Sequence, residues 1–285
     1  MKKIFIKILH KLQFLKHVNL IVNIELNKKV FKIPVIEGDG YSNLFISERW
    51  MISILELLLH KKEGCFVDVG VNIGQTLLKL KSVQSNREYF GFEPNSFCVH
   101  YTMNLIKLNN FKKTNLFPFG VSNKSEIGVL NFYSTGNSDS AASMISDFRP
   151  NQRIDRTTYI PLYDELAFSN LIGDGKMGFL KIDVEGAEFQ VLESFKGKIA
   201  EDKPIILIEI LPVYSKENTD RLERQKKVES ILEVEKYHLF RLVKTETKIK
   251  DLVMVESIGI HSEISACDYI CVHESDLDII KSIQL

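Results

Sequence analysis

Cysteine, tryptophan and long apolar runs are scarce in this sequence, and each scarcity excludes a class of protein. The 285 residues include 4 cysteines and 1 tryptophan. Cys65, Cys98, Cys267 and Cys271 form no C-x-x-C pair of the zinc or redox type, and they are too few for a disulfide-rich secreted scaffold. We therefore expect buried free thiols and a reducing, cytoplasmic compartment.

The sequence also has no net charge, because its 37 basic and 37 acidic residues cancel. Without a net field, nucleic acid is not an expected partner. No apolar run approaches the roughly 18 residues that cross a bilayer. The composition, 45% hydrophobic and 26% charged, is typical of a globular protein with a large core.

Residues 1–20 place five lysines among isoleucine, leucine and phenylalanine in a helical pattern. Lys7 and Lys11 interrupt the continuous apolar core that a secretion signal requires. The predicted basic amphipathic helix could associate weakly with a membrane surface. It could also pack on the body of the protein, and the general frequency of amphipathic helices in cores favours packing.

Two regions are predicted from the pattern of elements. Residues 1–60 form an N-terminal extension with the basic helix, a β-hairpin that turns at residues 27–29, and a packing helix that begins at Ser47. Residues 61–285 alternate strands with helices, which predicts an α/β fold with a Rossmann-like parallel sheet. The seven expected strands are residues 65–69, 88–93, 116–121, 178–182, 204–210, 237–243 and 268–272.

Residues 129–133 are predicted to form an added strand, and residues 159–162 an edge strand because they contain Pro161. Between them, residues 134–158 have no apolar periodicity. A loop of this length inside a compact domain is usually functional or disordered. We predict a substrate-side loop in which Ser140 and Ser143 bind a polyhydroxylated acceptor, with a flexible linker as the alternative.

A glycine-bearing turn follows the first predicted strand. A dinucleotide site requires G-x-G-x-x-G, whereas here Asn72 stands between Gly70 and Gly74 where the second glycine is needed. A ligand without a pyrophosphate therefore fits better, and we predict S-adenosylmethionine. Asp68 would attract its ammonium group, while the turn amides and Asn72 or Gln75 would bind its carboxylate.

Glu93 supports this prediction from the end of the second strand. It follows the turn by roughly 20 residues, where a Rossmann fold places the acid that binds the ribose hydroxyls. Pro94 then directs the chain out of the sheet. Each motif alone is weak, because acids at strand ends also cap helices. Their agreement in order and spacing is stronger evidence.

Four segments resemble the FkbM family of methyltransferases. They are DVGVNIG at residues 68–74, FEPN at 92–95, IPLYDEL at 160–166 and KIDVEGAE at 181–188, and the last is the most specific. The similarity covers about half the chain. It implies methylation of a hydroxyl by S-adenosylmethionine, often on a sugar. It also implies a seven-stranded class I methyltransferase sheet with helices on both faces and an antiparallel last hairpin.

The resemblance also implies roles for individual residues, with Asp68, Gly70, Asn72, Gly74 and Glu93 as cofactor contacts. The further predicted cofactor contacts are Gln75, Asn95, Ser122 and Asp183. Asp183 and Glu185 would line the methyl-transfer end. The sequence departs from the family at Val71, where a small residue is usual. Residues 120–122, at the exit of the third strand, offer no acid for the adenine.

A carboxylate is the expected general base. Asp183 is the first candidate because it ends a central strand, followed by Glu185 and then Glu209. Asp183 could instead cap the next helix or bind the amino group of the cofactor. His261 is a remote alternative. Asp183 and Glu209 could hold Mg²⁺, but no readable ligand spacing supports this and we expect no metal.

The leading hypothesis is a cytoplasmic O-methyltransferase that acts on a sugar or glycoconjugate hydroxyl. A small molecule or glycan is the expected partner, and the oligomeric state stays open. One alternative is a non-catalytic protein of the same fold that binds S-adenosylmethionine or glycans. A nicotinamide-dependent oxidoreductase is disfavoured because Asn72 replaces the glycine that it needs.

Overall fold

The structure is a computed structural model that describes residues 2–146, 148–149, 151–173 and 175–283. The outer ends of the predicted regions 1–60 and 61–285 lie outside the described residues. The same holds for Asp147 and Pro150 within the 134–158 loop.

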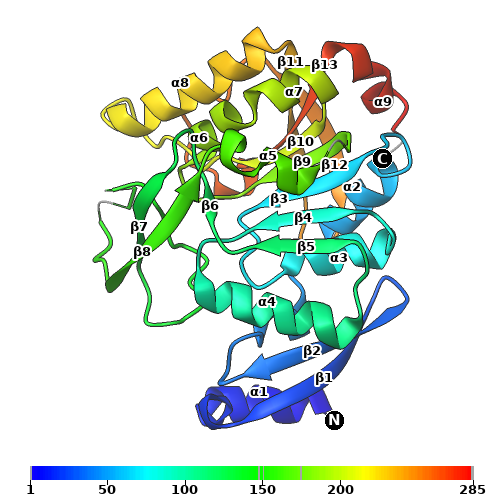
Figure 1. The fold of residues 1–285 in the computed structure, drawn as a ribbon, viewed down its shortest axis with the longest axis vertical. Coiled ribbons are helices and arrows are strands. Elements are labelled where there is room, and N and C mark those ends of the chain that lie inside the picture. The colour runs from blue at the N-terminus through cyan, green and yellow to red at the C-terminus, as the bar shows by residue number, and fades with distance from the viewer. Residues whose placement is uncertain (1, 147, 150, 174, 284–285) are drawn as a thin grey trace.

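An eight-stranded sheet forms the centre of the molecule, with strand order β12-β11-β13-β10-β9-β3-β4-β5 (Figure 1). The strands are β3 (Cys65–Val69), β4 (Tyr89–Phe92), β5 (Thr114–Phe117), β9 (Met177–Ile182), β10 (Ile205–Glu209), β11 (Tyr237–Lys244), β12 (Ile249–Val255) and β13 (Asp268–His273). From β5 to β10 neighbouring strands are parallel, and β13 is antiparallel to both β10 and β11. This confirms the predicted Rossmann-like sheet and its antiparallel end.

Two strands differ from the sequence prediction. β12 is an eighth strand that pairs antiparallel with β11 and widens the sheet at its edge. The single strand expected over residues 116–121 is divided into β5 and a separate short strand, β6 (Gly120–Val121). Pro118 lies between them and has no N–H to continue the ladder, which explains the break.

A second, three-stranded sheet has the order β6-β8-β7, with β7 at Glu126–Phe132 and β8 at Arg156–Tyr163. The prediction that residues 159–162 form an edge strand is wrong, because β8 is the middle strand. β6 pairs only with Leu162 and Tyr163 of β8. Pro161 therefore has no neighbouring strand on the β6 side, and its missing N–H breaks no ladder there.

Helices cover both faces of the central sheet, as predicted. On one face, α5 (Glu165–Ile172), α6 (Glu188–Ser194), α7 (Lys196–Asp202) and α8 (Thr219–Val234) contribute to one apolar core. On the other face, α2 (Trp50–Leu58), α3 (Gln75–Val83) and α9 (Leu277–Lys281) contribute to a second core. All five residues of β3 and all six of β9 are buried, as expected for strands covered on both faces.

The N-terminal extension lies at one end of the long axis of the molecule (Figure 1). It contains α1 (Lys2–Lys11), η1 (Phe14–His17), the antiparallel hairpin of β1 (Asn19–Leu26) and β2 (Lys29–Ile36), and η2 (Ser42–Phe45). The buried face of the hairpin joins α4 (Ser96–Asn109) in a third apolar core. The helix expected from Ser47 begins at Trp50, because Glu48 adopts a positive φ of 51° that a helix does not allow.

The four cysteines are free and buried, which confirms that part of the prediction. Within the described ranges, no helix has both the length and the apolar character to cross a membrane.

Candidate active site

A cavity of about 410 Å³ lies at the carboxyl ends of β3, β4, β9 and β10. This volume is typical of small-molecule sites. Most of the residues predicted from the sequence line it, namely Gly70, Asn72, Gln75, Glu93, Asn95, Ser140, Asp183, Glu185 and Glu209. Asp68, Gly74, Ser122 and Ser143 do not belong to its wall. Residues from widely separated parts of the sequence thus meet where parallel strands end, the usual ligand position in this kind of sheet.

The turn after β3 has a backbone that few side chains allow. Gly70, Asn72 and Gly74 have positive φ angles of 88°, 48° and 78°. A Cβ atom on Gly70 would lie 1.8 Å from the carbonyl oxygen of Asp183, so no other residue fits there without movement of β9. Gly74 instead faces α4, where a Cβ would lie 2.9 Å from Leu105. Glycine is therefore needed at position 70 because of the Asp183 carbonyl and at position 74 because of the packing against α4.

Glu93 connects the turn to the end of β4. Its carboxylate accepts the backbone N–H of Asn72 at 2.7 Å and that of Asn95 at 2.8 Å. Each carboxylate oxygen has a further lone pair for a ligand. Burial raises the pKa of Glu93 to about 7, although the two amide bonds oppose this shift. Glu93 is thus a fixed acceptor on the cavity wall.

Asp68 lies behind the cavity wall. It is fully buried, and it accepts the Tyr89 hydroxyl at 2.7 Å and lies 3.4 Å from the ammonium group of Lys181. Burial raises the pKa of Asp68. Asp68, predicted to bind a ligand ammonium group, thus lies outside the cavity wall, with its carboxylate beside Tyr89 and Lys181.

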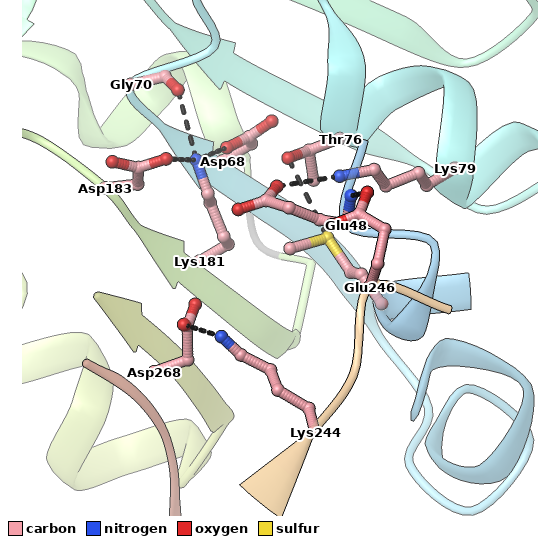
Figure 2. A network of polar contacts seen from close by, with 11 residues as sticks. Glu48, Asp68, Gly70, Thr76, Lys79, Lys181, Asp183, Lys244, Glu246 and Asp268 are labelled. Carbon is pink, nitrogen blue, oxygen red and sulfur yellow. Dashed lines mark hydrogen bonds and ion pairs between the residues drawn. The ribbon is translucent and has the colours of Figure 1, made fainter. Parts of the chain in front are cut away.

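Lys181 connects this buried acid to the cavity (Figure 2). Its Nζ donates to the carbonyl oxygen of Gly70 and to the Asp183 carboxylate, each at 3.1 Å. Burial alone would lower the pKa of Lys181, but Asp183 and Asp68 raise it above its usual value. Lys181, a charged residue in a buried strand, is thus paired with two acids. The lysine holds the turn and the end of β9 together.

The opposite wall of the cavity is rich in acids. The Asp183 side chain is 38% exposed and contacts Lys181 through one oxygen. Glu185 accepts the Arg149 guanidinium at 2.7 Å, and burial together with Asp183 raises its pKa to about 7. Burial and the nearby Asp183 raise the pKa of Glu209 to about 9. Glu209 therefore keeps its proton at neutral pH.

Sequence reasoning missed two further acids on this wall. Glu48, before α2, pairs with the buried Lys79 at 2.9 Å, and Asp268 pairs with Lys244 (Figure 2). Asp268 opens β13, and because that strand is antiparallel its first residue meets the carboxyl ends of the others. The strand predicted at residues 268–272 could have placed Asp268 at this edge of the sheet, whereas no pattern in the sequence placed Glu48 there. Among the described residues, no group of three His, Cys, Asp or Glu side chains is arranged to hold a metal.

Part of the 134–158 loop lines the cavity. Ser138, Asp139 and Ser140 line the cavity. Asp139 accepts the backbone N–H groups of Tyr133 and Ser134, and Asn95 of α4 donates to the carbonyl of Asn137 at 2.8 Å. The described part of the loop is therefore tied to the body by hydrogen bonds.

Two predicted contacts lie elsewhere. Ser143 is 1% exposed and donates its hydroxyl to the carbonyl oxygen of Glu185 at 2.5 Å, so it supports the acid wall from behind. Ser122 is 4% exposed, and its N–H donates to Tyr163 where the small sheet continues. Because the chain leaves the central sheet at Pro118, Gly120 and Val121 line the cavity and Ser122 does not.

Comparisons with known proteins identify a family for most of the chain. The methyltransferase FkbM domain matches residues 68–242. A comparison with curated proteins gives no match. Among solved structures, the FkbM methyltransferase from Methylobacillus flagellatus KT is 17% identical with a TM-score of 0.45, covering 74% of this chain. The chain spans 44% of the length of that protein.

Two other solved methyltransferases are among the matches. A putative O-methyltransferase from Klebsiella pneumoniae is 8% identical with a TM-score of 0.44, covering 78% of this chain and 79% of that one. M. jannaschii TYW2, in complex with AdoMet, is 12% identical with a TM-score of 0.37, covering 89% of this chain and 86% of that one. The family match includes the glycine turn, Glu93 and the acids after β9. The chain belongs to the FkbM methyltransferase domain family.

Proposed function

We propose that this protein is an S-adenosylmethionine-dependent O-methyltransferase that acts on a hydroxyl of a sugar or glycoconjugate in the cytoplasm. One observation carries the proposal. The turn at residues 70–74 and Glu93 form one wall of a single cavity, and Asp183, Glu185 and Glu209 line the other. A cofactor and an acceptor can therefore meet between them.

The first wall fits the cofactor. Gly70 brings the backbone close to a ligand, Asn72 and Gln75 offer polar groups, and Glu93 has free lone pairs for ribose hydroxyls. Asn95 also lines this wall, but its side chain already caps α4 through the N–H of Phe97. When bound, S-adenosylmethionine would supply an electrophilic methyl group on a sulfonium centre.

The charge of the cavity also favours this cofactor over a nicotinamide dinucleotide. Among the described residues of its wall, the basic and acidic side chains are one lysine, Lys181, and seven acids, Glu48, Glu93, Asp139, Asp183, Glu185, Glu209 and Asp268. Of these acids, Glu209 is protonated at neutral pH. Such a wall attracts a sulfonium and an ammonium group and repels a pyrophosphate. The nicotinamide-dependent alternative is therefore disfavoured by electrostatics as well as by Asn72.

Asp183 is our first candidate for the general base. One of its oxygens binds Lys181, and the other is free to take the proton of an acceptor hydroxyl as that oxygen bonds to the methyl carbon. Glu185 is the second candidate, since a pKa of about 7 suits a base at neutral pH. Glu209, protonated at neutral pH, would donate a hydrogen bond to an acceptor oxygen instead.

Orientation of the acceptor would supply most of the remaining rate enhancement. Holding the acceptor oxygen in line with the transferred methyl group can contribute about 7 to 11 kcal/mol, as in well-oriented intramolecular reactions. Base assistance adds a factor of roughly a hundred to ten thousand. Ser138, Asp139 and Ser140 of the loop would position a polyhydroxylated acceptor, which is the reason for proposing a sugar.

The test is transfer of a labelled methyl group from S-adenosylmethionine to a panel of sugars and glycoconjugates. We expect transfer by the wild type, a loss of roughly a hundredfold or more for Asp183→Asn, and no change for the exposed control Asp278→Asn. Cofactor binding without transfer to any glycan would favour the non-catalytic alternative. A greater loss for Glu185→Gln than for Asp183→Asn would move the base to Glu185.

A further inference from the structure

The N-terminal helix α1 has apolar residues on two opposite sides. Ile6 is 5% exposed and packs into the core between the hairpin and α4. His10 stacks on Tyr41, with ring centroids 3.8 Å apart, on the same side of the helix. These contacts dock α1 on the body of the protein, which is the arrangement that sequence reasoning favoured.

The other side of α1 faces away from the body. Ile8 and Leu12, one helical turn apart, are 50% and 59% exposed, and Phe14 just beyond the helix is 57% exposed. At 100° per residue, Ile8 lies about 160° around the helix from Ile6. We call Ile8, Leu12 and Phe14 the outer apolar stripe. Ile8 and Leu12 have the i, i+4 spacing of a buried helix face, yet the described part of the chain leaves them and Phe14 open to solvent.

The charges of the segment that carries the outer stripe are of one sign. Residues 1–24 contain five lysines and no aspartate or glutamate, although the whole chain is neutral. Lys11 and Lys16 are exposed, and Lys7 lies 4.8 Å over the Phe45 ring. A stripe of large apolar side chains flanked by lysines is the pattern of a helix that lies in a membrane interface. A second protein surface would not in general require the positive charge.

We propose that α1 and η1 dock this protein on an anionic lipid surface, with Ile8, Leu12 and Phe14 inserted among the acyl chains and Lys11 and Lys16 at the headgroups. This interaction surface is separate from the cavity, since none of these residues lines it. Gln13 has a positive φ of 60° between α1 and η1. This bend separates the exposed Phe14 from the helix. The next residue, Leu15, is 1% exposed and anchors the segment to the body of the protein.

The experiment is co-sedimentation of the full chain with phosphatidylcholine vesicles and with vesicles that also contain phosphatidylglycerol. We expect binding to the anionic vesicles only, and weaker binding at high ionic strength. Ile8→Asp with Leu12→Asp should lower the lipid partition coefficient by roughly tenfold or more. Lys11→Glu with Lys16→Glu should do the same by removing the charge attraction.

The matched control is Val234→Asp with Met254→Asp, two apolar residues that are 67% and 63% exposed elsewhere on the surface. It should bind vesicles like the wild type, and all variants should keep the unfolding temperature of the wild type because the changed side chains are exposed. Equal binding by the stripe variant and the wild type would refute the proposal. So would absence of vesicle binding together with a dimer in solution that Ile8→Asp and Leu12→Asp dissociate. Neither result depends on the methyl-transfer assay.

Discussion

The two walls of the cavity are built in different ways. The wall that we propose binds the cofactor (the cofactor wall) consists of backbone at the ends of adjacent strands, where Gly70 abuts the carbonyl of Asp183 and Glu93 binds the N–H of Asn72. The wall that we propose binds the acceptor (the acceptor wall) consists of side chains from distant segments, from Glu48 before α2 to Asp268 at the start of β13, together with part of the 134–158 loop. One wall is fixed by chain geometry and the other by charge balance.

This difference indicates which parts of the site can vary. A change in the cofactor wall displaces β3 and β9, which are fully buried, so the cost reaches the core. A change in the loop affects a surface segment held by a few hydrogen bonds, so that a different acceptor can be accommodated without refolding. The predictions below test this contrast.

The largest effect is expected at Gly70. Gly70→Ala places a Cβ atom 1.8 Å from the Asp183 carbonyl in a backbone of positive φ, and should lower the free energy of unfolding by roughly 3 kcal/mol or more. Gly136→Ala, in the loop, meets only Ser134 at 3.6 Å and should change it by less than about 1 kcal/mol. Urea denaturation followed by circular dichroism measures both, and equal costs would remove the contrast.

Lys181→Met should have the second-largest effect on the free energy of unfolding. It leaves the fully buried Asp68 without its cation and should cost roughly 3 to 5 kcal/mol, as for other broken buried ion pairs. Lys281→Met removes an exposed pair with Asp278 and should cost less than about 1 kcal/mol. Denaturant midpoints of the two variants give the comparison. A small cost for Lys181→Met would mean that Asp68 is neutral and needs no partner.

Glu209→Gln tests the charge balance of the acceptor wall. The folded-state pKa of Glu209 is about 9 against an ordinary value of 4.5, so the folded state holds the proton more tightly. Stability of the wild type should therefore fall as pH rises through this window. Glutamine does not titrate, so the variant should be more stable at about pH 8, on the order of 1 to 3 kcal/mol, and equal to the wild type at about pH 4.

Thermal unfolding of the wild type and Glu209→Gln across this pH range is the measurement. A difference between the two proteins that does not grow with pH would show that Glu209 is ionised in the folded state. The hydrogen-bond donor role proposed for it would then fail.

The smallest effect is expected at Ser140. Loss of one exposed loop hydroxyl should raise the KM for the glycan acceptor less than about tenfold, because a single neutral hydrogen bond contributes roughly 0.5 to 1.5 kcal/mol. The affinity for the cofactor should not change in Ser140→Ala, since the residue lies on the acceptor side. Steady-state kinetics with each substrate varied in turn separates the two. A change only in the affinity for the cofactor would contradict the assignment of Ser140 to the acceptor wall.

The same contrast explains what the sequence could predict. Gly70, Asn72 and Glu93 are recognisable because local backbone requirements leave a fixed spacing along the chain. Glu48 was missed because its approach to the site depends on how the N-terminal extension packs, and no local pattern encodes that.

The prediction for Pro161 failed for a comparable reason. Pro161 indicated an edge strand, whereas the shortness of β6 allows a proline in the middle of the small sheet. A correct local rule was overridden there by a neighbour from another part of the chain. Asp68 was predicted to bind the ammonium group of the cofactor, and it lies beside Tyr89 and Lys181, outside the cavity wall.

Calorimetric titration with S-adenosylhomocysteine tests the central claim most directly. We predict one site per chain for the wild type, an affinity lowered roughly tenfold or more by Glu93→Gln, and no heat from NAD. Binding of NAD in place of S-adenosylhomocysteine, or an unchanged affinity in Glu93→Gln, would contradict the placement of the cofactor between the 70–74 turn and Glu93.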